Sequence, residues 1–401
     1  MAFLHFDESI EAIKNIDIRN YKIVKRYLID TLGYVLAKDI IADHNSPDFP
    51  TSAMDGYAVR HSDLKTGRLK ITSINPAGLD INRDVLKGEC IKTFTGSLMP
   101  NGADTIIPIE NVTVEGDEIV IHKEVPYGFA VREIGENYAK GDKLISKGTK
   151  IDFAEVGVMA SLNMVSVLVY EKPRVAILST GSELLELGET QTSVAQIRSS
   201  NNYILEAIVK RYGGEALQLG CIRDDKATIL KSIASALEQS DIVVTTGGVS
   251  VGDFDFVEDV IYELGCRVIF KGVRVKPGQH IMVAQKDDKF IIGLPGFAYS
   301  ATVTALLYLV PLIAKLQQSK YSLQKVEATL LEPFAKRNKK AEFVACNLML
   351  KNGNYYVDFQ GKKSGTSAIL TNMLGNTALL VSPEEDSSKS AGDKVQILLL
   401  D

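Results

Sequence analysis

The fold is most clearly indicated by residues 241–255, Asp-Ile-Val-Val-Thr-Thr-Gly-Gly-Val-Ser-Val-Gly-Asp-Phe-Asp, where an apolar run passes directly into a glycine-rich turn. The run Ile242–Thr245 is rich in β-branched residues, which favour a buried strand. The turn Thr246–Gly252 allows close approach of the backbone to a ligand, because glycine has no Cβ. A strand followed at once by such a turn is typical of the carboxyl edge of a parallel sheet.

Residues 174–320 repeat this pattern on both sides of that stretch. The predicted strands are Val175–Ser179, Ala216–Cys221, Ile242–Thr245, Arg267–Phe270 and Phe290–Leu294. Amphipathic helices are predicted between them at Asn201–Arg211 and Ala227–Glu238. Strands that alternate with helices of this length predict a three-layer αβα domain with a parallel-rich sheet and right-handed crossovers. The apolar segment 298–316 is interpreted as a buried helix of this domain rather than a membrane span, since it contains Ser300 and Pro311.

The rest of the chain predicts a multidomain protein, because 401 residues exceed what one compact core usually holds. Two prolines in Ser46–Pro50 end a first segment, which we interpret as helical with Ile23, Val24, Tyr27 and Leu28 on one face. Short β-like runs follow, and the tail ends in another, Lys394–Leu400. The sequence therefore divides into a helical segment (1–45), a small mostly-β domain (46–139), a segment similar in character to the first (140–173), the α/β domain (174–320) and a small C-terminal β domain (321–401).

Composition narrows the class of protein. The net charge of −5 does not favour binding to nucleic acid or to an anionic membrane. The four cysteines form no CxxC pair and the five histidines have no zinc-type spacing, which indicates reduced thiols in a cytoplasmic protein without a zinc site. The N-terminal residues carry Asp7, Glu8 and Glu11, unlike a signal peptide, and Phe6, Ile10 and Ile13 recur at helical spacing.

Three glycine-containing turns follow predicted strands: Thr180–Glu183, Thr246–Gly252 and Gly293–Gly296. Because the carboxyl ends of parallel strands share one edge of the sheet, we expect these turns to line one crevice. Free N–H groups at helix N-termini suit anions there. Each turn alone is more often a plain strand-to-helix connection, and three in succession favour a ligand site.

Acidic residues accompany these turns, namely Glu183, Asp224, Asp225, Asp253 and Asp255. For Asp224 and Asp225, helix capping and a functional role are equally supported. Carboxylates beside a phosphate-binding turn imply a bridging cation, and Mg²⁺ binds one or two carboxylates together with phosphate oxygens. Lys276 stands at a strand end near the same crevice, where it favours oxyanion binding over the usual role of a solvated lysine.

Taken together, the chain resembles the MoeA family, which includes the gephyrin E domain, over nearly its whole length. The resemblance rests on the strings Thr51–Ala58, Thr93–Gly96 with Pro100–Thr105, Val131–Glu136, Ser179–Leu184, Gly247–Gly252 with Asp255, Val275–Gly278 and Gly293–Gly296, and at the C-terminus on Ser364–Thr366 and Ala391–Asp393. It implies a homodimer with four domains per chain, one of which is a discontinuous helical linking domain formed by residues 1–45 and 140–173. The α/β domain resembles the adenylyltransferase MogA. The implied reaction converts adenylylated molybdopterin and molybdate into molybdenum cofactor and AMP.

The resemblance also implies the roles of individual residues. Five positions match the family's polar functional residues: Asp55, Thr95, Glu183, Asp224 and Asp255. Substrate binding is implied for Gly181, Ser182, Gly247, Gly248, Ser250, Lys276, Pro277, Pro295, Gly296 and Ser300. We expect Glu183 and Asp255 to hold Mg²⁺ near the pyrophosphate-type bond, with molybdate beside Lys276 and Ser300. The Asp55 and Thr95 strings are expected to complete the site of the partner subunit.

Two departures from the family pattern bear on the oxyanion. Phe297-Ala298-Tyr299 stands where the family commonly has Asn-Pro-Val, and Gln279-His280 where it commonly has Lys-Pro. An amide and a lysine are thereby missing, which predicts a change in oxyanion affinity or in the choice between molybdate and tungstate. Two other functions stay open: a MogA-type adenylyltransferase, which we also consider as a partner of this chain, and a non-enzymatic scaffold as gephyrin also is.

Overall fold

The structure is a computed structural model that describes residues 3–18, 21–79, 83–248, 256–319, 323–363 and 367–400. The chain forms two compact units. The larger unit comprises Met1–Ala37, Gly148–Asp152 and Ser166–Asp401. The smaller unit comprises Lys38–Lys147 and Phe153–Val165.

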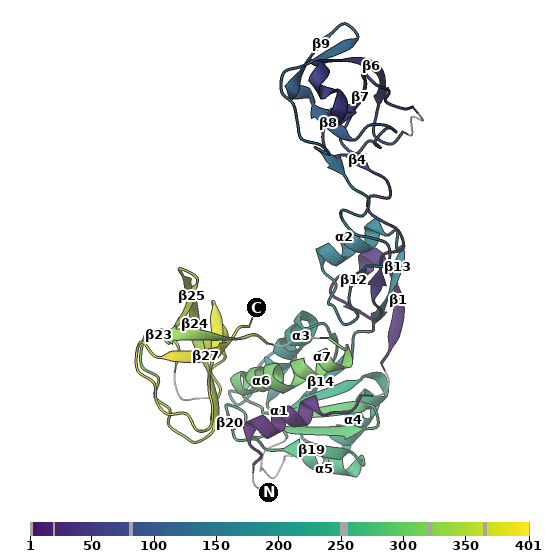
Figure 1. Cartoon of the computed structure of the whole chain (residues 1–401). Helices are drawn as coiled ribbons and strands as arrows, with labels where there is room; N and C mark the ends of the chain where they lie inside the picture. The colour runs from purple at the N-terminus through teal and green to yellow at the C-terminus, as the bar shows by residue number, and fades with distance from the viewer. Residues whose placement is uncertain are drawn as a thin grey trace. The chain divides into compact units, whose positions relative to one another are not determined.

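A six-stranded sheet with helices on both faces forms the centre of the larger unit (Figure 1). Its strands, in spatial order, are β17 (Glu215–Ile222), β14 (Arg174–Thr180), β18 (Ile242–Thr246), β22 (Lys289–Leu294), β21 (Met282–Lys286) and β19 (Arg267–Lys271). The first four strands run parallel to one another, and β21 runs antiparallel to both of its neighbours. The predicted parallel-rich sheet is confirmed.

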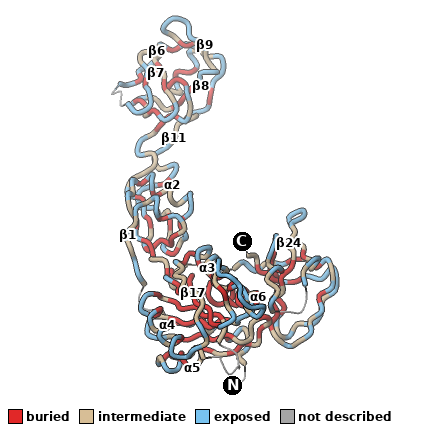
Figure 2. The backbone as a smooth tube through the Cα atoms, turned by 180° about the vertical axis from the view of Figure 1, so that it is seen from behind, coloured by how far each residue is buried: buried red, intermediate tan, exposed pale blue. Residues whose placement is uncertain are grey.

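The sheet is covered on both faces because both sets of alternating side chains are apolar. Val175 and Ile177 of β14 join a core with helices α1 (Phe6–Lys14), α3 (Asn201–Arg211), α6 (Ala298–Thr304) and α7 (Val310–Leu316). Ala176 and Leu178 point to the opposite core, formed with α4 (Lys226–Gln239) and α5 (Val257–Glu263). The buried residues concentrate along these central strands (Figure 2), so the predicted three-layer architecture is confirmed.

The apolar segment 298–316 lies in one of these cores. It consists of α6, a π-helical turn η4 (Ala305–Leu309) and α7, and 83% of its most apolar 18-residue stretch is buried. It is the one helix in the described part of the chain long and apolar enough to cross a membrane. Its burial against the sheet supports its interpretation as a core helix.

The linking region differs from the prediction. Residues 1–45 were expected to be helical, but α1 is the one α-helix in the described part of that segment. Ile23–Tyr27 is strand β1, which pairs antiparallel with β13 (Ser166–Tyr170). Strand β2 (Val35–Leu36) completes this small sheet on the other side of β13. The helical interpretation is wrong because the apolar side chains of Ile23 and Tyr27 stay exposed, and backbone pairing to a segment far along the chain determines the conformation.

The C-terminal β domain of the larger unit is built around one sheet. Its strands, in spatial order, are β20 (Val275–Lys276), β24 (Ala341–Lys351), β25 (Asn354–Asp358), β23 (Lys325–Leu330), β27 (Lys394–Leu398) and β26 (Thr377–Ser382). Strand β20 comes from the α/β part of the chain and pairs in parallel with β24. The first strand of this sheet is therefore supplied by a segment that precedes the domain in sequence.

The smaller unit is mostly β, as predicted. Its six-stranded sheet has the order β8 (Thr105–Pro108), β5 (Gly56–Val59), β7 (Glu89–Thr93), β6 (Arg68–Asn75), β10 (Glu118–Ile121) and β9 (Val112–Glu115). The pairs β4 (Thr51–Ser52) with β11 (Val131–Arg132) and β3 (Ile40–Ile41) with β12 (Lys143–Ile145), and helix α2 (Phe153–Ser161), complete it.

Candidate active site

Three neighbouring parallel strands end at one edge of the central sheet. Strands β14, β18 and β22 are in register there, with Ser179 opposite Thr246 and Thr246 opposite Leu294. The turns that follow contain Gly181, the pair Gly247 and Gly248, and Pro295 with Gly296. The Gly247 N–H donates to the Leu294 carbonyl at 3.1 Å, so two of the turns are directly linked. We call this edge the glycine crevice; the expected convergence of the turns is confirmed.

The crevice has room only for backbone at its centre. Gly247 has a φ of +87°, and a Cβ there would stand 2.8 Å from the Thr180 carbonyl oxygen. Gly248 has a φ of +69°, and its Cβ would stand 2.6 Å from the Val257 side chain. Any larger residue would clash as well as adopt an unfavourable left-handed conformation. The turn therefore depends on glycine at both positions.

Two carboxylates lie beside the first turn. The Glu183 carboxylate folds over Gly181, with both oxygens 2.9 Å from where a Cβ of that glycine would be. The Asp224 carboxylate accepts a hydrogen bond from the Ser182 N–H at 3.0 Å. Asp224 is thus held at the crevice by the turn itself.

The neighbouring Asp225 caps a helix instead of contacting the first turn. Its carboxylate accepts from the Thr228 hydroxyl and from the Thr228 N–H, the latter at 2.8 Å, and so caps helix α4. The same bonds, the hydroxyl first, lower the pKa of the Asp225 carboxyl. The two adjacent acids, for which capping and function were equally supported, are therefore separated by the structure into a cap and a crevice residue.

Buried polar groups beneath the crevice were not identified from the sequence. Asn201, at the start of α3, donates through its amide to the Gly296 carbonyl at 2.8 Å. Below it, the Ser179 hydroxyl donates to Asn202 Oδ1 at 2.6 Å and lies 2.7 Å from the Thr246 hydroxyl. The signal in the sequence is the run Ser199-Ser200-Asn201-Asn202, of which Asn201 and Asn202 were predicted only as part of a helix.

A second feature, a cavity of about 440 Å³, lies where β20 meets the C-terminal sheet. We call it the cationic cavity because four basic side chains line it together with two acidic ones. These charged residues are Lys276, Arg337, Lys362, Lys363, Glu332 and Glu342. Pro277 and Ser367 also line it. Of the expected oxyanion residues, Lys276 and Pro277 therefore lie in its wall.

The basic groups of the cavity differ in what they can offer a ligand. The Lys362 ammonium donates to the carbonyls of Asn372 and Leu374 at 2.7 and 3.0 Å and to the Thr377 hydroxyl at 2.8 Å. Desolvation lowers the pKa of Lys362. By contrast, the side chains of Arg337 and Lys363 have no ion-pair partner among the described residues. Lys362 therefore serves the fold, and Arg337 and Lys363 are available to an anion.

Ser300 lies behind the cavity wall. It is 2% exposed, and both its N–H and its hydroxyl donate to the Ser367 carbonyl, at 3.2 and 3.5 Å. The departures before it can also be placed. Phe297 is exposed, and the Tyr299 hydroxyl donates to the Phe343 carbonyl at 3.1 Å and accepts from the Ala345 N–H at 2.9 Å. Burial raises the pKa of Tyr299 to about 12, so this hydroxyl stays protonated and tied to β24.

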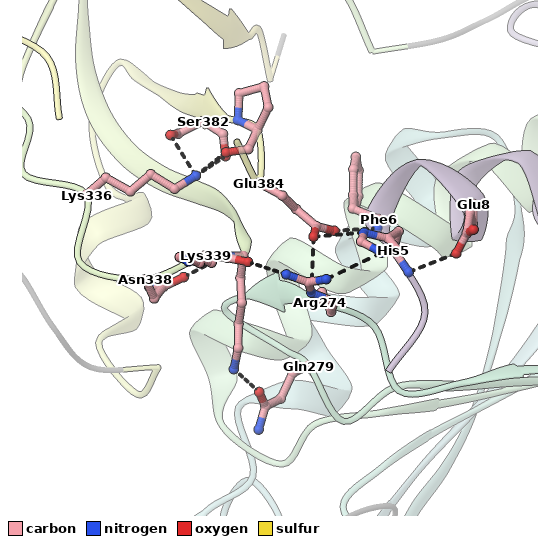
Figure 3. A network of polar contacts seen from close by, with 12 residues as sticks. His5, Phe6, Glu8, Arg274, Gln279, Lys336, Asn338, Lys339, Ser382 and Glu384 are labelled. Carbon is pink, nitrogen blue, oxygen red and sulfur yellow. Dashed lines mark hydrogen bonds and ion pairs between the residues drawn. The ribbon is translucent and has the colours of Figure 1, made fainter. Parts of the chain in front are cut away.

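A polar network supports the loop that carries part of the cavity wall (Figure 3). Arg274 donates to the Lys339 carbonyl at 3.0 Å and forms an ion pair with Glu384 at 3.1 Å. Glu384 also accepts from the Phe6 N–H at 3.0 Å, at the start of α1. Lys339 follows Arg337 closely in sequence, so this network anchors the loop next to the cavity.

In the smaller unit, Asp55 and Thr95 are brought together. The Thr95 N–H and hydroxyl both donate to Asp55 Oδ1, at 2.8 and 3.0 Å. These two bonds, the backbone one first, lower the pKa of the Asp55 carboxyl. Asp55, before β5, and Thr95, after β7, thus link two exposed loops of that unit, which we call the Asp55–Thr95 pair.

Three residues singled out from the sequence, Ser250, Asp253 and Asp255, lie outside the described part of the chain. Among the described residues there is no group of three or more His, Cys, Asp or Glu side chains arranged as a metal site. The available carboxylates at the crevice are those of Glu183 and Asp224.

Comparisons with known proteins agree with this architecture. Residues 4–163 match the MoeA N-terminal region (domains I and II), residues 176–315 a probable molybdopterin binding domain, and residues 327–400 the MoeA C-terminal region (domain IV). The chain is 32% identical to a molybdopterin molybdenumtransferase of Haemophilus influenzae over 92% of each chain. For one from Nostoc the identity is 31%, over 92% of this chain and 86% of the relative. A solved structure of the molybdopterin biosynthesis MoeA protein of Pyrococcus horikoshii superposes with a TM-score of 0.83 at 27% identity, covering all of both chains.

Proposed function

Because the chain belongs to the family of molybdopterin molybdenumtransferases and acts in molybdenum cofactor biosynthesis, we propose that its glycine crevice binds the phosphate end of adenylylated molybdopterin and its cationic cavity binds molybdate. One observation carries this assignment. Gly278, two residues after Lys276, stands against Pro295 of the crevice, with its Cβ position 3.6 Å from the Pro295 side chain. The cavity and the crevice are thus neighbours, as a transfer between two bound substrates requires.

The crevice suits the phosphate end for a physical reason. Backbone N–H groups bind phosphate oxygens well, and we assign Gly181, Ser182, Gly247, Gly248 and Gly296 to the phosphate end. The N–H groups of Gly181, Ser182 and Gly247 already donate to Ile222, Asp224 and Leu294, so we assign the N–H groups of Gly248 and Gly296 to the phosphate oxygens. Asp224 keeps the Ser182 N–H in place through its hydrogen bond and thereby orients the first turn.

The cavity suits a tetrahedral dianion. Lys276, Arg337 and Lys363 provide positive charge and hydrogen-bond donors. Ser300 fixes the Ser367 backbone at the wall, which is a positioning role rather than direct contact. Negative charge that develops on an oxygen atom as AMP leaves would be stabilised by hydrogen-bond donors that are already in place.

Magnesium fits the crevice by its donor chemistry. Mg²⁺ prefers oxygen ligands and is commonly held by one or two carboxylates together with substrate phosphates. Glu183 and Asp224 provide two carboxylates at the phosphate-binding turn, and Asp255 follows the second turn in sequence. We assign Glu183 and Asp255 as ligands; when bound, the ion would supply positive charge for the leaving phosphate oxygens.

We further propose that the protein is a homodimer, because of the Asp55–Thr95 pair. The pair lies on the smaller unit, and its carboxylate is exposed and held ionised by two hydrogen bonds. We propose that it joins the crevice of a second copy, and that the protein works in the cytoplasm on the product of a MogA-type adenylyltransferase. The four thiols are unpaired, in keeping with a reducing compartment.

The test is a reaction with purified components. Adenylylated molybdopterin, molybdate and Mg²⁺ are mixed with the protein, and AMP and molybdenum cofactor are measured by chromatography. We expect AMP release that depends on molybdate. If the protein instead forms adenylylated pterin from molybdopterin and ATP, the result would support the adenylyltransferase. If it shows neither activity, the scaffold function would be favoured. Light scattering at micromolar concentration checks the dimer, which a monomer mass would contradict.

A further inference from the structure

The cationic cavity contains an ion pair that occupies its own lysine. Lys276 in β20 and Glu342 in β24 stand directly opposite each other in the parallel pairing, and the Lys276 ammonium lies 3.8 Å from Glu342 Oε2. The Glu342 side chain is only 5% exposed, whereas that of Lys276 is 44% exposed. One partner is therefore fixed in the wall and the other can move toward the cavity.

The Glu342 carboxylate is held firmly in this position. Its other oxygen, Oε1, accepts a hydrogen bond from the Asn338 amide at 2.5 Å. Glu332, the second acid of the cavity, differs, because its carboxylate accepts from the Phe359 N–H and has no ion-pair partner among the described residues. Of the two acids, Glu342 is the one that pairs with a lysine assigned to the ligand.

A fixed carboxylate at this place acts against an incoming dianion because it competes for the lysine charge that the ligand needs. The favourable Lys276–Glu342 contact must be weakened before the ammonium can serve the ligand fully. Affinity for the oxyanion is thus lower than the number of basic side chains suggests.

We propose that Glu342 is an internal counter-anion of the cationic cavity, which competes with the oxyanion for Lys276 and so sets how tightly the oxyanion is held. This inference rests on the proposed function, because it takes the oxyanion to bind in this cavity. Glu342 acts through Lys276 and is a positioning residue. Its role is to keep the oxyanion loosely bound, so that the oxyanion can be passed on to the neighbouring crevice.

Equilibrium dialysis of the full-length protein against molybdate, at low ionic strength, tests the proposal. Glu342→Gln keeps an acceptor for Asn338 and removes the charge, and we expect it to lower the molybdate Kd by about 5-fold. In the Lys276→Met background the same substitution should change Kd by less than about 2-fold, because the competition needs the lysine. The matched control Glu332→Gln, in the same cavity, should change Kd by less than about 2-fold.

An unchanged or higher Kd in Glu342→Gln would overturn the proposal, since structural damage and loss of a positioning contact both weaken binding. A 5-fold gain that persists in the Lys276→Met background, or appears equally in Glu332→Gln, would also overturn it in favour of general electrostatics. If Glu342→Gln does not fold, Glu342→Asp replaces it with about a 2-fold expected gain, because the shorter side chain withdraws the carboxylate. Absence of saturable binding by both wild type and Glu342→Gln would refute the cavity assignment itself, whereas wild-type binding without a Glu342 effect refutes only the counter-anion.

Discussion

The glycine crevice and the cationic cavity lie side by side in the larger unit but are lined by different groups, backbone in one and charged side chains in the other. The crevice is formed by backbone, and added atoms at Gly247 or Gly248 would meet neighbours at 2.8 and 2.6 Å. The cavity is formed by side chains, with six charged groups around about 440 Å³. Activity should therefore depend on the size of the residues in the crevice and on the charge of the side chains in the cavity. Four comparisons test this distinction, in order of decreasing expected effect of the first substitution named in each.

Gly247→Ala should have the largest effect. The added methyl group would clash with the Thr180 carbonyl at a φ of +87°, which costs about 1–3 kcal/mol in strain and displaces the phosphate-binding N–H groups. We expect the rate of AMP release to fall by about 100-fold. Gly188→Ala is the matched control, because Gly188 also has a positive φ, +91°, with no atom within 4 Å of the added Cβ. Equal loss in both variants would show that backbone strain, and not the crevice, is responsible.

Lys276→Met tests the charge of the cavity. Loss of a charged hydrogen bond to the oxyanion should raise the molybdate concentration for half-maximal rate by about 10- to 100-fold. The rate at saturating molybdate should change less, because the crevice is untouched. A reduced maximal rate with unchanged half-saturation would contradict the assignment of Lys276 to the oxyanion.

Lys362→Met separates a structural lysine from a ligand lysine in the same cavity. The Lys362 ammonium makes three hydrogen bonds to the 372–377 segment, so its loss should lower the free energy of unfolding by about 1–3 kcal/mol. Thermal denaturation measures this change, and molybdate half-saturation should move less than in Lys276→Met. A shift in molybdate half-saturation as large as that of Lys276→Met, with little loss of stability, would place Lys362 among the ligand groups.

Asp225→Ala should have the smallest effect, and it tests whether Asp225 lies outside the crevice. Loss of the α4 cap should lower the melting temperature by about 2 °C and leave AMP release nearly unchanged. Asp224→Ala, one residue earlier, should instead reduce AMP release by about 10-fold, because the Ser182 turn loses its support. If the two variants behaved in the opposite way, the division of roles between these acids would be wrong.

The sequence predicted the α/β layers well because both faces of each strand are apolar and the helices between them are long. Helix α3 was predicted with its observed bounds, Asn201–Arg211. Strand β1 was predicted incorrectly, since five residues with exposed Ile23 and Tyr27 carry no reliable periodicity and are fixed by a partner more than 140 residues away. Strand β21 was not predicted, because only the short run 281–284 is apolar before the polar residues 285–289 that lead through the hairpin into β22.

The candidate site was predictable where its chemistry is local. Glycine turns after strands are visible in the sequence, and their convergence follows from parallel pairing. The pairing of Lys276 with Glu342 was not predictable, because the two residues are far apart in the chain and meet only through β20 joining the C-terminal sheet. The split between Asp224 and Asp225 likewise depends on which carboxylate faces the turn and which faces the helix.

Strand β20 has a consequence for synthesis of the protein. On the ribosome, the segment Val275–Lys276 emerges well before its partner β24, and domains tend to fold in the order in which they are made. The nascent α/β domain can thus assemble its glycine turns early, but Lys276 has no strand beside it until Ala341 and Glu342 have left the exit tunnel. The proposed oxyanion cavity is therefore completed only after the α/β domain, once the segment that forms β24 has been made.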